Sequence, residues 1–484
     1  MKKFYRNNFH KLMSKVFNKI EFWIFLFFVF RLIGITAPPL EIGHNWRQTT
    51  GLMVTRNYLE VDSNLLLPRV DETKGESGII GMEFPSLNYI FFALTKVFNY
   101  KHWYGRLINL IVSSIGLLFF SKIIQKFFSK KVVIASTLFL LGSIWFSFSR
   151  KMMPDTYCIS LMFIGIYYGI NYLNQGKTLN VFLYVIFTTL AILSKIPAGI
   201  YFTLLIPMMF WNFNRIHKVI IASTTLIPLF LTYLWYFIWN PHLSKVYGNW
   251  YNSGKTIAEG FIEIAANLDL VFKNFYFHSF SGYIIFIFFL FGFVLIIRHW
   301  NRFLILSISM LSLFFIIYIL KSGYFFYHHN YYIIPFVPVM ALISGYCIGG
   351  INKKWIFITC IIIGLSESIL NQQHDFFIKE SEKYKLELES ISDLVSSKKD
   401  LIAINGNDNP QQLYLAHRKG WTCSDSLITD LSFINNIQKK GCRYIFLNKH
   451  SCNKSINRKI VFSNVNFTVY DLNMPTNKKY LPIK

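Results

Sequence analysis

Long apolar stretches recur between about residues 20 and 370, and polar segments separate them. A helix needs about 20 largely apolar residues to cross the hydrocarbon core of a bilayer. These stretches predict eleven membrane-spanning helices, near residues 21–38, 107–124, 132–149, 156–173, 179–194, 197–213, 218–239, 281–298, 303–320, 331–349 and 355–370.

Two of the polar segments are long, residues 39–106 and 240–280. The first, called loop 1 below (residues 38–106), contains two stretches with helical periodicity, 47–60 and 86–99. Amphipathic helices of this kind lie flat at a membrane surface. We therefore predict that loop 1 forms a structured cap over one face of the membrane.

The tail after residue 371 is polar and contains no stretch long enough to span a membrane. Its start, Ile378–Ser397, is typical of an amphipathic helix, and short strand-like stretches follow. We predict a membrane domain in residues 1–370 and a small α/β domain in residues 371–484, a length within the usual domain range. The expected strands are Leu401–Ile404, Tyr444–Leu447 and Phe467–Tyr470.

The predicted fold is thus an α-helical polytopic membrane protein with about 11 transmembrane helices, a large outer loop 1 with surface helices, and a small C-terminal α/β domain. Composition supports this class, because 53% of the 484 residues are hydrophobic and only 15% are charged. Soluble domains carry about 25% charged residues. A large soluble protein is therefore excluded.

The formal net charge of +25 raises the question of a nucleic acid partner. The basic residues do not form one stripe, and many lie in short gaps between apolar stretches, as orientation signals do in membrane proteins. We therefore expect a lipid bilayer and no nucleic acid as the partner of this charge.

The same charges orient the predicted helices. With the N-terminus in the cytoplasm, every short inner gap is basic and both long gaps fall outside, as the positive-inside rule requires. An odd number of spans then places the tail outside. We predict a multi-pass protein of the cytoplasmic membrane with an extracytoplasmic C-terminal domain. The inner basic residues are Lys2, Lys3, Arg6, Lys11, Lys15, Lys19, Lys126, Lys130, Lys131, Lys177, Arg215, Lys218, Arg298, Arg302, Lys353 and Lys354.

Ionisable residues are rare in the apolar stretches and gather in loop 1 and at the outer ends of the predicted helices. A sugar bound to a lipid phosphate cannot leave the bilayer, so an enzyme that uses it works at the membrane surface. Transfer needs a carboxylate to activate the acceptor and cations to stabilise the departing phosphate. The candidates are Glu41, His44, Arg47, Gln48, Arg56, Asp71 and Glu83 in loop 1, and Arg150, Lys151, Asp155, Lys195, His328 and His329 at helix ends.

Several short motifs resemble those of the GT-C superfamily of lipid-phosphate-sugar-dependent glycosyltransferases. Within it the chain is similar to the protein O-mannosyltransferases and the aminoarabinose transferase of lipid A. The resemblance covers about residues 20–350 and rests on the order and sidedness of the motifs. They are Glu83-Phe-Pro-Ser-Leu-Asn-Tyr89, Arg106-Leu107, Met153-Pro154-Asp155, Ser194-Lys195 and Tyr331-Tyr332-Ile-Ile-Pro335.

Loop 1 departs from the family pattern at one place. The family usually has an Asp-Glu pair about nine residues before an Arg like Arg56, and here Arg47-Gln48 stand there. Asp71 and Glu83 are therefore the candidate catalytic carboxylates, with His44 as a further catalytic candidate and Glu41 in reserve.

The resemblance implies a polyprenyl-phosphate-linked sugar donor, a cell-envelope acceptor and inverting single displacement. It also implies roles in the site for Asp155 and in lipid-phosphate binding for Lys195. From their place at the outer membrane edge we expect lipid-phosphate or substrate binding by Arg47, Gln48, Arg150, Lys151, His328 and His329 as well. The sequence contains no dedicated metal-ligand cluster and demands no cofactor, although a divalent metal is compatible with it.

Each candidate also has a structural interpretation. Asp71 lies in a turn-prone segment, Glu83 suits a helix N-terminus, Asp155 suits a helix N-cap, and Lys195 suits a side chain that reaches toward headgroups. The histidine pair fits an interfacial position beside Tyr331.

Two other functions compete with the transferase. A transporter or flippase of a lipid-linked or envelope substrate would place ionisable residues along a path through the membrane, whereas here they gather at the outer rim. A non-catalytic assembly partner would use the tail as a binding module.

Overall fold

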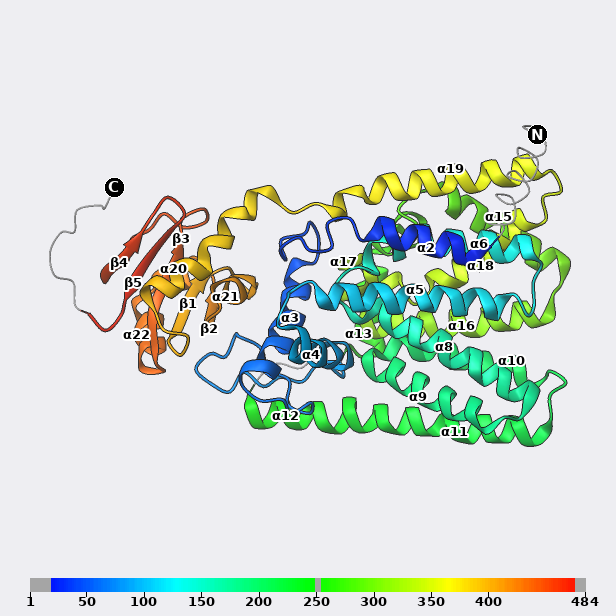
Figure 1. Ribbon diagram of the computed structural model, residues 1–484, viewed down its shortest axis with the longest axis horizontal. Coiled ribbons are helices and arrows are strands. Elements are labelled where there is room, and N and C mark those ends of the chain that lie inside the picture. The colour runs from blue at the N-terminus through cyan, green and yellow to red at the C-terminus, as the bar shows by residue number, and fades with distance from the viewer. Residues whose placement is uncertain (1–18, 249–253, 475–484) are drawn as a thin grey trace, which may run out of the picture. The chain divides into compact units, whose positions relative to one another are not determined.

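The computed structural model describes residues 19–248 and 254–474. The basic segment before residue 19, with five of the predicted inner charges, lies outside the described residues. The chain forms two compact units (Figure 1). The helical unit comprises Met1–Ile35, Gly105–Ile238 and Asn252–Phe376, and the mixed unit comprises Thr36–Tyr104, Trp239–Tyr251 and Phe377–Lys484.

Most of the helical unit is α-helix. Within the described residues of the chain, five helices are long and apolar enough to cross a membrane: Tyr104–Ile124, Pro154–Gln175, Arg215–Tyr247, which continues through short π-helical and α-helical turns, Arg302–Ser322 and Lys354–Phe376. Five further apolar helices have 10–17 residues: Ser86–Phe98, which belongs to the mixed unit, Thr178–Ser194, Ile196–Met209, Ile284–His299 and Val337–Gly349. These helices are those of a multi-pass membrane protein, whereas the number of eleven crossings stays a prediction.

The helices of this unit have the following bounds. They are α2 (Ile20–Arg31), α5 (Tyr104–Ile124), α6 (Lys130–Gly142), α7 (Trp145–Phe148), α8 (Pro154–Gln175), α9 (Thr178–Ser194), η1 (Ile196–Leu204), α10 (Leu205–Met209), α11 (Arg215–Tyr233), η2 (Leu234–Trp239), α13 (Ile257–Ala265), α14 (Leu268–Lys273), η3 (Asn274–His278), α15 (Ile284–His299), α16 (Arg302–Ser322), α17 (Tyr324–His328), η4 (Asn330–Ile333), α18 (Val337–Gly349), α19 (Lys354–Gln372) and η5 (Gln373–Phe376).

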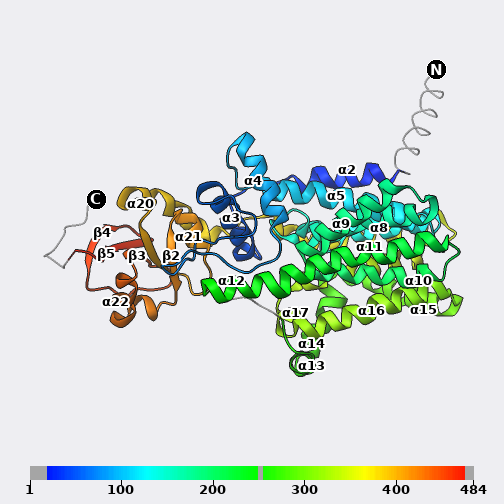
Figure 2. The ribbon, with the colours of Figure 1, turned by 90° about the horizontal axis from the view of Figure 1, so that it is seen from below.

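Helices α8, α9 and α11 pack side by side in that order, and α18 packs against both α6 and α15 (Figures 1 and 2). Small residues allow the closest approaches, as is usual between membrane helices. A Cβ atom built on Gly116 of α5 would lie 2.3 Å from Cβ of Ser160 on α8, and one on Gly345 of α18 would lie 2.1 Å from Oγ of Ser136 on α6. A larger side chain at either glycine would force the helices apart.

In the mixed unit, loop 1 contributes α3 (Asn45–Glu60) and α4 (Ser86–Phe98), close to the two stretches expected to be helical. The helices pack together, and Nδ2 of Asn88 donates to the carbonyl of Gly51 at 2.6 Å. The short helix α12 (Asn240–Tyr247) belongs to the same unit. A position of α3 and α4 on the membrane surface stays a prediction.

The tail folds around a five-stranded sheet with the strand order β2-β1-β3-β5-β4 (Figure 1). Strand β1 pairs in parallel with β2 and β3, whereas β5 is antiparallel to β3 and β4. Its elements are η6 (Glu380–Glu387), α20 (Leu388–Val395), β1 (Leu401–Asn405), α21 (Gln411–Ala416), β2 (Lys419–Cys423), η7 (Leu427–Thr429), α22 (Leu431–Lys439), β3 (Cys442–Asn448), β4 (Lys459–Ser463) and β5 (Phe467–Asp471).

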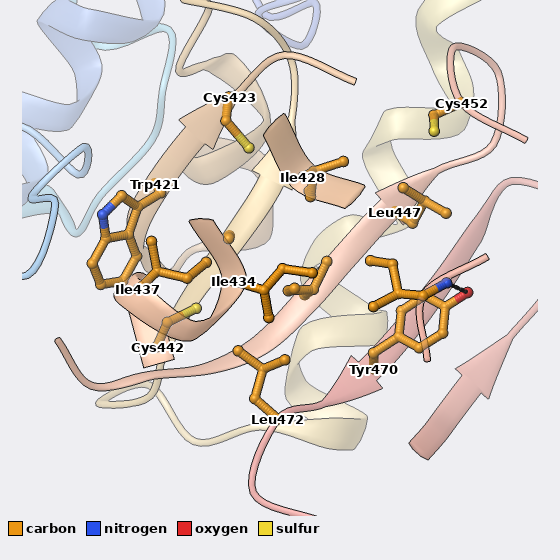
Figure 3. Packing of buried hydrophobic residues seen from close by; sticks show 13 residues of the cluster. Trp421, Cys423, Ile428, Ile434, Ile437, Cys442, Leu447, Cys452, Tyr470 and Leu472 are labelled. Atoms are coloured by element: carbon orange, nitrogen blue, oxygen red, sulfur yellow. Dashed lines mark hydrogen bonds between the residues drawn. The ribbon is translucent and has the colours of Figure 1, made fainter. Parts of the chain in front are cut away.

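One face of the sheet packs on α22 through a buried apolar cluster (Figure 3). Ile434 and Ile437 of α22 meet Ile445 and Leu447 of β3, and all four side chains are buried. The cysteines of this cluster, Cys423, Cys442 and Cys452, are free thiols. Burial of this apolar surface is the main source of stability for the sheet.

The three strands expected from the sequence are present as β1, β3 and β5, and the tail is an α/β fold as predicted. The expected helix over 378–397 is a 3₁₀ helix, η6, followed by α20. Strands β2 and β4 were not predicted, because Lys-Gly opens β2 and β4 is largely exposed.

Loop 1 contacts the tail through backbone hydrogen bonds. The amide of Gly420 in β2 donates to the carbonyl of Asp71, and the amide of Lys74 donates to the carbonyl of Gly420, both at 3.0 Å. Glu41 forms an antiparallel bridge with Ile378. Loop 1 and the tail therefore belong to one compact unit.

Candidate functional site

Asp155 and Lys195 form a buried ion pair in the helical unit. Asp155 lies in the first turn of α8, where a negative charge is favourable, and the residue that caps this helix is Met153. Lys195 follows the last residue of α9 in extended backbone, which directs the chain out of the helix. The side chains are only 4% and 12% exposed, and Oδ2 of Asp155 has no hydrogen-bond partner among the residues described.

Aromatic rings surround the ammonium group of Lys195. Its Nζ lies 5.0 Å from the ring centre of Tyr331 and 5.4 Å from that of Tyr332, both in η4. The ring of His329 stacks near Tyr331 at 5.2 Å. His328 instead packs against Tyr324, with ring centres 3.7 Å apart. The structure thus brings His329, but not His328, next to the tyrosines around Lys195.

Arg150 and Lys151 lie in the turn between α7 and α8, and both are almost fully buried. The guanidinium of Arg150 lies 4.1 Å from the ring centre of Phe376. Lys151 lies 4.0 Å from Oδ1 of Asp375 and 5.4 Å from the ring centre of Phe148. The Phe148 ring is 5.8 Å from that of Tyr331, so this turn is continuous with the surroundings of Lys195.

Asn109 on α5 holds the turn that carries Arg150 and Lys151. Its Nδ2 donates to the carbonyl of Lys151 at 2.8 Å and to those of Phe148 and Met153 at 3.2 Å. Asn109 could not be predicted from the sequence, because a single amide in an apolar helix gives no pattern. The same holds for Arg31, which donates to Oγ of Ser149 at 2.5 Å.

These residues form what we call the cationic cluster: Arg31, Arg150, Lys151, Asp155, Lys195 and Asp375. It gathers four cationic side chains and two carboxylates in a largely buried place. A phosphate group accepts the charge-assisted hydrogen bonds that Arg and Lys donate, so a cluster of this kind suits an anionic ligand.

Glu83 and Arg47 form a second ion pair, in loop 1 of the mixed unit. Nη2 of Arg47 on α3 lies 2.5 Å from Oε1 of Glu83, which precedes α4. The side chains are 29% and 23% exposed, so solvent or a ligand can reach them. The backbone beside Glu83 is fixed by Asn240, whose Nδ2 donates to the carbonyl of Met82 at 2.8 Å.

The other candidates near the start of α3 take different positions. Nε2 of Gln48 donates to Oε2 of Glu41 at 2.9 Å, and both side chains are buried. His44 precedes α3 with a left-handed backbone, at φ 57°, and its carbonyl accepts from the amide of Gln48. Glu41, His44 and Gln48 are therefore neighbours at this helix end.

Asp71 is 2% exposed and paired on both carboxylate oxygens. Oδ2 accepts from Arg56 at 2.6 Å and Oδ1 accepts from Asn57 at 2.9 Å. Arg56 also donates to the carbonyl of Tyr414. Burial lowers the pKa of Arg56, but Asp71, Tyr414, Tyr100 and Glu60 together outweigh burial, and the pKa rises above its usual value. This geometry ties loop 1 to the tail.

Within residues 19–248 and 254–474, no group of three His, Cys, Asp or Glu side chains is placed to hold a metal ion. The candidate residues thus fall into the cationic cluster of the helical unit and the loop 1 carboxylates of the mixed unit.

Comparisons with known proteins give one family-model match and several matches to solved structures. Residues 83–239 match the family model described as dolichyl-phosphate-mannose-protein mannosyltransferase. A search among curated proteins gives no match.

Solved structures match over most of the chain. ArnT from Cupriavidus metallidurans in the apo state has a TM-score of 0.55 at 10% identity, over 93% of this chain and 97% of that one. Its complex with undecaprenyl phosphate has a TM-score of 0.56 at 9% identity, over 94% and 99%. The apo oligosaccharyltransferase of Archaeoglobus fulgidus has a TM-score of 0.57 at 12% identity, over 88% and 70%. The chain therefore has the same overall fold as these proteins.

The resemblance expected from the motifs is confirmed by the match to this family model and by the shared fold. The segment that matches the family model contains Glu83, Arg150, Lys151, Asp155 and Lys195. It begins after Arg47-Gln48, which stand where an Asp-Glu pair is expected. Glu83 forms an ion pair with Arg47 and therefore places a carboxylate next to that position.

Proposed function

We propose that this protein is a membrane glycosyltransferase that transfers a sugar from a polyprenyl-phosphate donor to a cell-envelope acceptor. The observation that carries the proposal is the gathering of four cationic side chains in the cationic cluster. The GT-C fold supports it, since the similarly folded ArnT from Cupriavidus metallidurans binds undecaprenyl phosphate. A transporter gains no specific support from the described residues.

We propose that Lys195, Arg150 and Lys151 bind the phosphate of the donor. Phosphate competes with Asp155 for the ammonium of Lys195, and Tyr331 and Tyr332 restrict the directions in which that ammonium can move. Asp155 then acts as a positioning residue that holds Lys195 ready before the donor arrives. His329 supports the tyrosines by stacking, and His328 has no assigned contact with the phosphate.

We assign activation of the acceptor to Glu83. Its partial exposure allows an acceptor to reach it, and the ion pair with Arg47 holds the carboxylate in place. Asp71 is a weaker candidate for the base, because both of its oxygens are already occupied and it is buried. Gln48, Glu41 and His44 then shape the helix end from which Arg47 extends.

The reaction is a single displacement. The acceptor hydroxyl attacks the anomeric carbon, its proton passes to the carboxylate of Glu83, and the bond between the anomeric carbon and the phosphate oxygen breaks. The polyprenyl phosphate leaves with both electrons of that bond, and the cations stabilise its added negative charge. The anomeric configuration inverts.

We place the reaction on the extracytoplasmic side of the cytoplasmic membrane, with the N-terminus in the cytoplasm. The basic gaps on the opposite side support this orientation through the positive-inside rule. Residues 1–370 then form the transferase domain, and residues 371–484, with which loop 1 shares a compact unit, act on the acceptor.

A deletion strain tests the function directly. Mass spectrometry of its cell-envelope glycans is expected to show the loss of one sugar, which the wild-type gene restores and Lys195→Met does not. The matched control is Lys126→Met, which removes an exposed lysine bonded to Asn171 outside the cationic cluster. Unchanged glycans in the deletion strain would contradict the proposal.

A further inference from the structure

A polar cavity of about 180 Å³ lies in the tail, apart from the residues assigned to transfer. This size suits a small molecule or one residue of a larger one. The residues that line it come from segments far apart in the sequence. They are Tyr384, Lys385, Asn405, Gly406, Asn407, Asn409, Gln411, Gln412, Asp425, Asn448 and Ser451.

The position of this cavity follows from the topology of the sheet. The chain leaves β1 to form β2 on one side and then returns to form β3 on the other side. The loops that follow β1 and β3 therefore diverge and leave a crevice at the carboxyl ends of the strands, where α/β sheets bind ligands. Asn405 ends β1 and Asn448 ends β3.

Hydrogen bonds fix the side chains that line the cavity. Nδ2 of Asn405 donates to Oδ1 of Asp425 at 2.7 Å and to Oγ of Ser451 at 2.9 Å. Nδ2 of Asn448 donates to the hydroxyl of Tyr384 at 2.9 Å and to Oε1 of Gln412 at 3.1 Å. A lining held in this way is organised before a ligand binds, which lowers the cost of binding.

Charge argues for a neutral ligand. The lining contains one cation, Lys385, and one carboxylate, Asp425. Lys385 already donates to Glu382 at 2.9 Å and to Gln411 at 3.2 Å. The single cation of the lining is therefore already bonded and is matched by a carboxylate, so the cavity offers little positive charge to a phosphate.

The remaining lining favours hydroxyl groups. Six carboxamide side chains line the cavity, and a carboxamide carries both donors and an acceptor. Those of Asn405, Gln411, Gln412 and Asn448 are held by protein partners, so the side chain of Asn407 and Nδ2 of Asn409 are best placed to bond a ligand. Oδ1 of Asp425 accepts from Asn405 and Ser451, and its Oδ2 has no hydrogen-bond partner among the residues described. A free carboxylate oxygen accepts from a ligand hydroxyl, which both donates and accepts. A neutral compound with several hydroxyl groups fits this lining.

We infer that this cavity binds a neutral saccharide residue. That this saccharide residue belongs to the acceptor, and is not a free sugar, rests on the proposed function. In that case the tail selects the acceptor by holding a sugar near the acceptor's reacting end, and the specificity of transfer is determined partly in this cavity.

Binding is measured on the full-length protein in nanodiscs without glycolipid, because alkyl glycoside detergents would compete. Saturation-transfer NMR uses neutral hexoses, pentoses and N-acetylhexosamines, each as the free sugar and as a trisaccharide. At least one of these probes is expected to bind. A trisaccharide that binds more tightly than its monosaccharide indicates a glycan acceptor, and equal affinity indicates a free sugar.

Two variants assign the binding to the cavity. Asp425→Asn, which has the same shape, and Asn407→Gly, at an exposed position with φ 52°, are expected to weaken binding about tenfold. The control Asn435→Ala changes an exposed residue on α22 that contacts Arg458, and binding is expected to stay unchanged. Thermal unfolding checks that each variant is folded.

The inference fails if no neutral saccharide binds, if the cavity variants leave binding unchanged, or if inorganic phosphate displaces the sugar. Lys195→Met separates this outcome from a failure of the proposed function. That variant is expected to keep saccharide binding, because Lys195 belongs to the helical unit. Binding without any transfer by the wild-type protein would leave the cavity in place and contradict only the transferase.

Discussion

Arg56 of α3 and Asp71 form an ion pair 2.6 Å long in which both side chains are almost fully buried. The pair is part of a larger arrangement, since Asn57 also donates to Asp71 and the guanidinium of Arg56 lies 4.4 Å from the ring centre of Tyr414. Asp71 is therefore expected to matter for the stability of the mixed unit, and this sets it apart from Glu83.

Asp71→Asn is expected to lower stability, because it leaves the charge of Arg56 buried without its partner. Loss of one member of a buried pair costs about 3 kcal/mol or more. The measurement is the midpoint of thermal unfolding in nanodiscs. Asn57→Ala removes the weaker contact to Asp71 and is expected to cost less.

A double variant tests whether the pair itself is responsible. Arg56→Met with Asp71→Asn is expected to be less destabilised than the sum of the single changes, because neither charge is left buried alone. If Asp71→Asn abolishes transfer and leaves the midpoint unchanged, Asp71 is catalytic and the assignment of Glu83 is wrong.

Glu83→Gln is expected to lower kcat by about 10² to 10⁴-fold, the usual contribution of a general base. Sugar transfer to the acceptor is followed with purified protein, and the unfolding midpoint is expected to change little since Glu83 is partly exposed. Glu76→Gln, an exposed carboxylate in the same loop, is the matched control. Full activity of Glu83→Gln would exclude it as the base.

Lys195→Met is expected to lower transfer by about 100-fold or more, because a cation that stabilises the leaving phosphate is lost. Lys195→Arg keeps the charge and is expected to restore part of the activity. Binding of polyprenyl phosphate, measured by native mass spectrometry, should weaken with Lys195→Met but not with Lys126→Met. Equal binding by all variants would argue against a phosphate at the cationic cluster.

Glu72→Gln is expected to stabilise the mixed unit near neutral pH. Burial raises the pKa of Glu72, and the nearby Lys74 only partly opposes this. A carboxyl group whose pKa is raised by folding contributes stability that is full below the unfolded pKa of about 4.3 and is lost as pH rises through the folded pKa. The gain in unfolding midpoint should therefore be present at pH 7.5 and vanish near pH 4. A gain of equal size at both pH values would contradict this origin.

Periodicity was enough to predict much of the fold. Helices α3 and α4 and strands β1, β3 and β5 follow the expected stretches, because their apolar positions repeat with the period of the element. Strand β2 was not predicted, because its residues Lys419 and Gly420 are poor strand formers. Its pairing with β1 depends on the tertiary structure and not on local preference.

The site was predicted less completely, because charge pairs depend on distance in space. Asp155 and Lys195 were both candidates, but nothing in their separation of 40 positions indicated an ion pair. Arg47 was noted as a departure from the family pattern, and only the structure gives it Glu83 as a partner. Arg31 and Asn109 were missed because an isolated polar residue in an apolar helix has several interpretations.

The hydrogen bonds between Gly420 and the segment Asp71–Lys74 have a consequence for biosynthesis. Strand β2 lies at one edge of the sheet, and loop 1 supplies partners for that edge. Loop 1 leaves the ribosome about 350 residues before β2, which at typical synthesis rates is roughly 20 to 70 seconds. During that time the charged side chains of loop 1 that are buried in the folded protein lack the tail that they contact. A chaperone that shields loop 1 while the later helices insert would therefore raise the yield of folded protein.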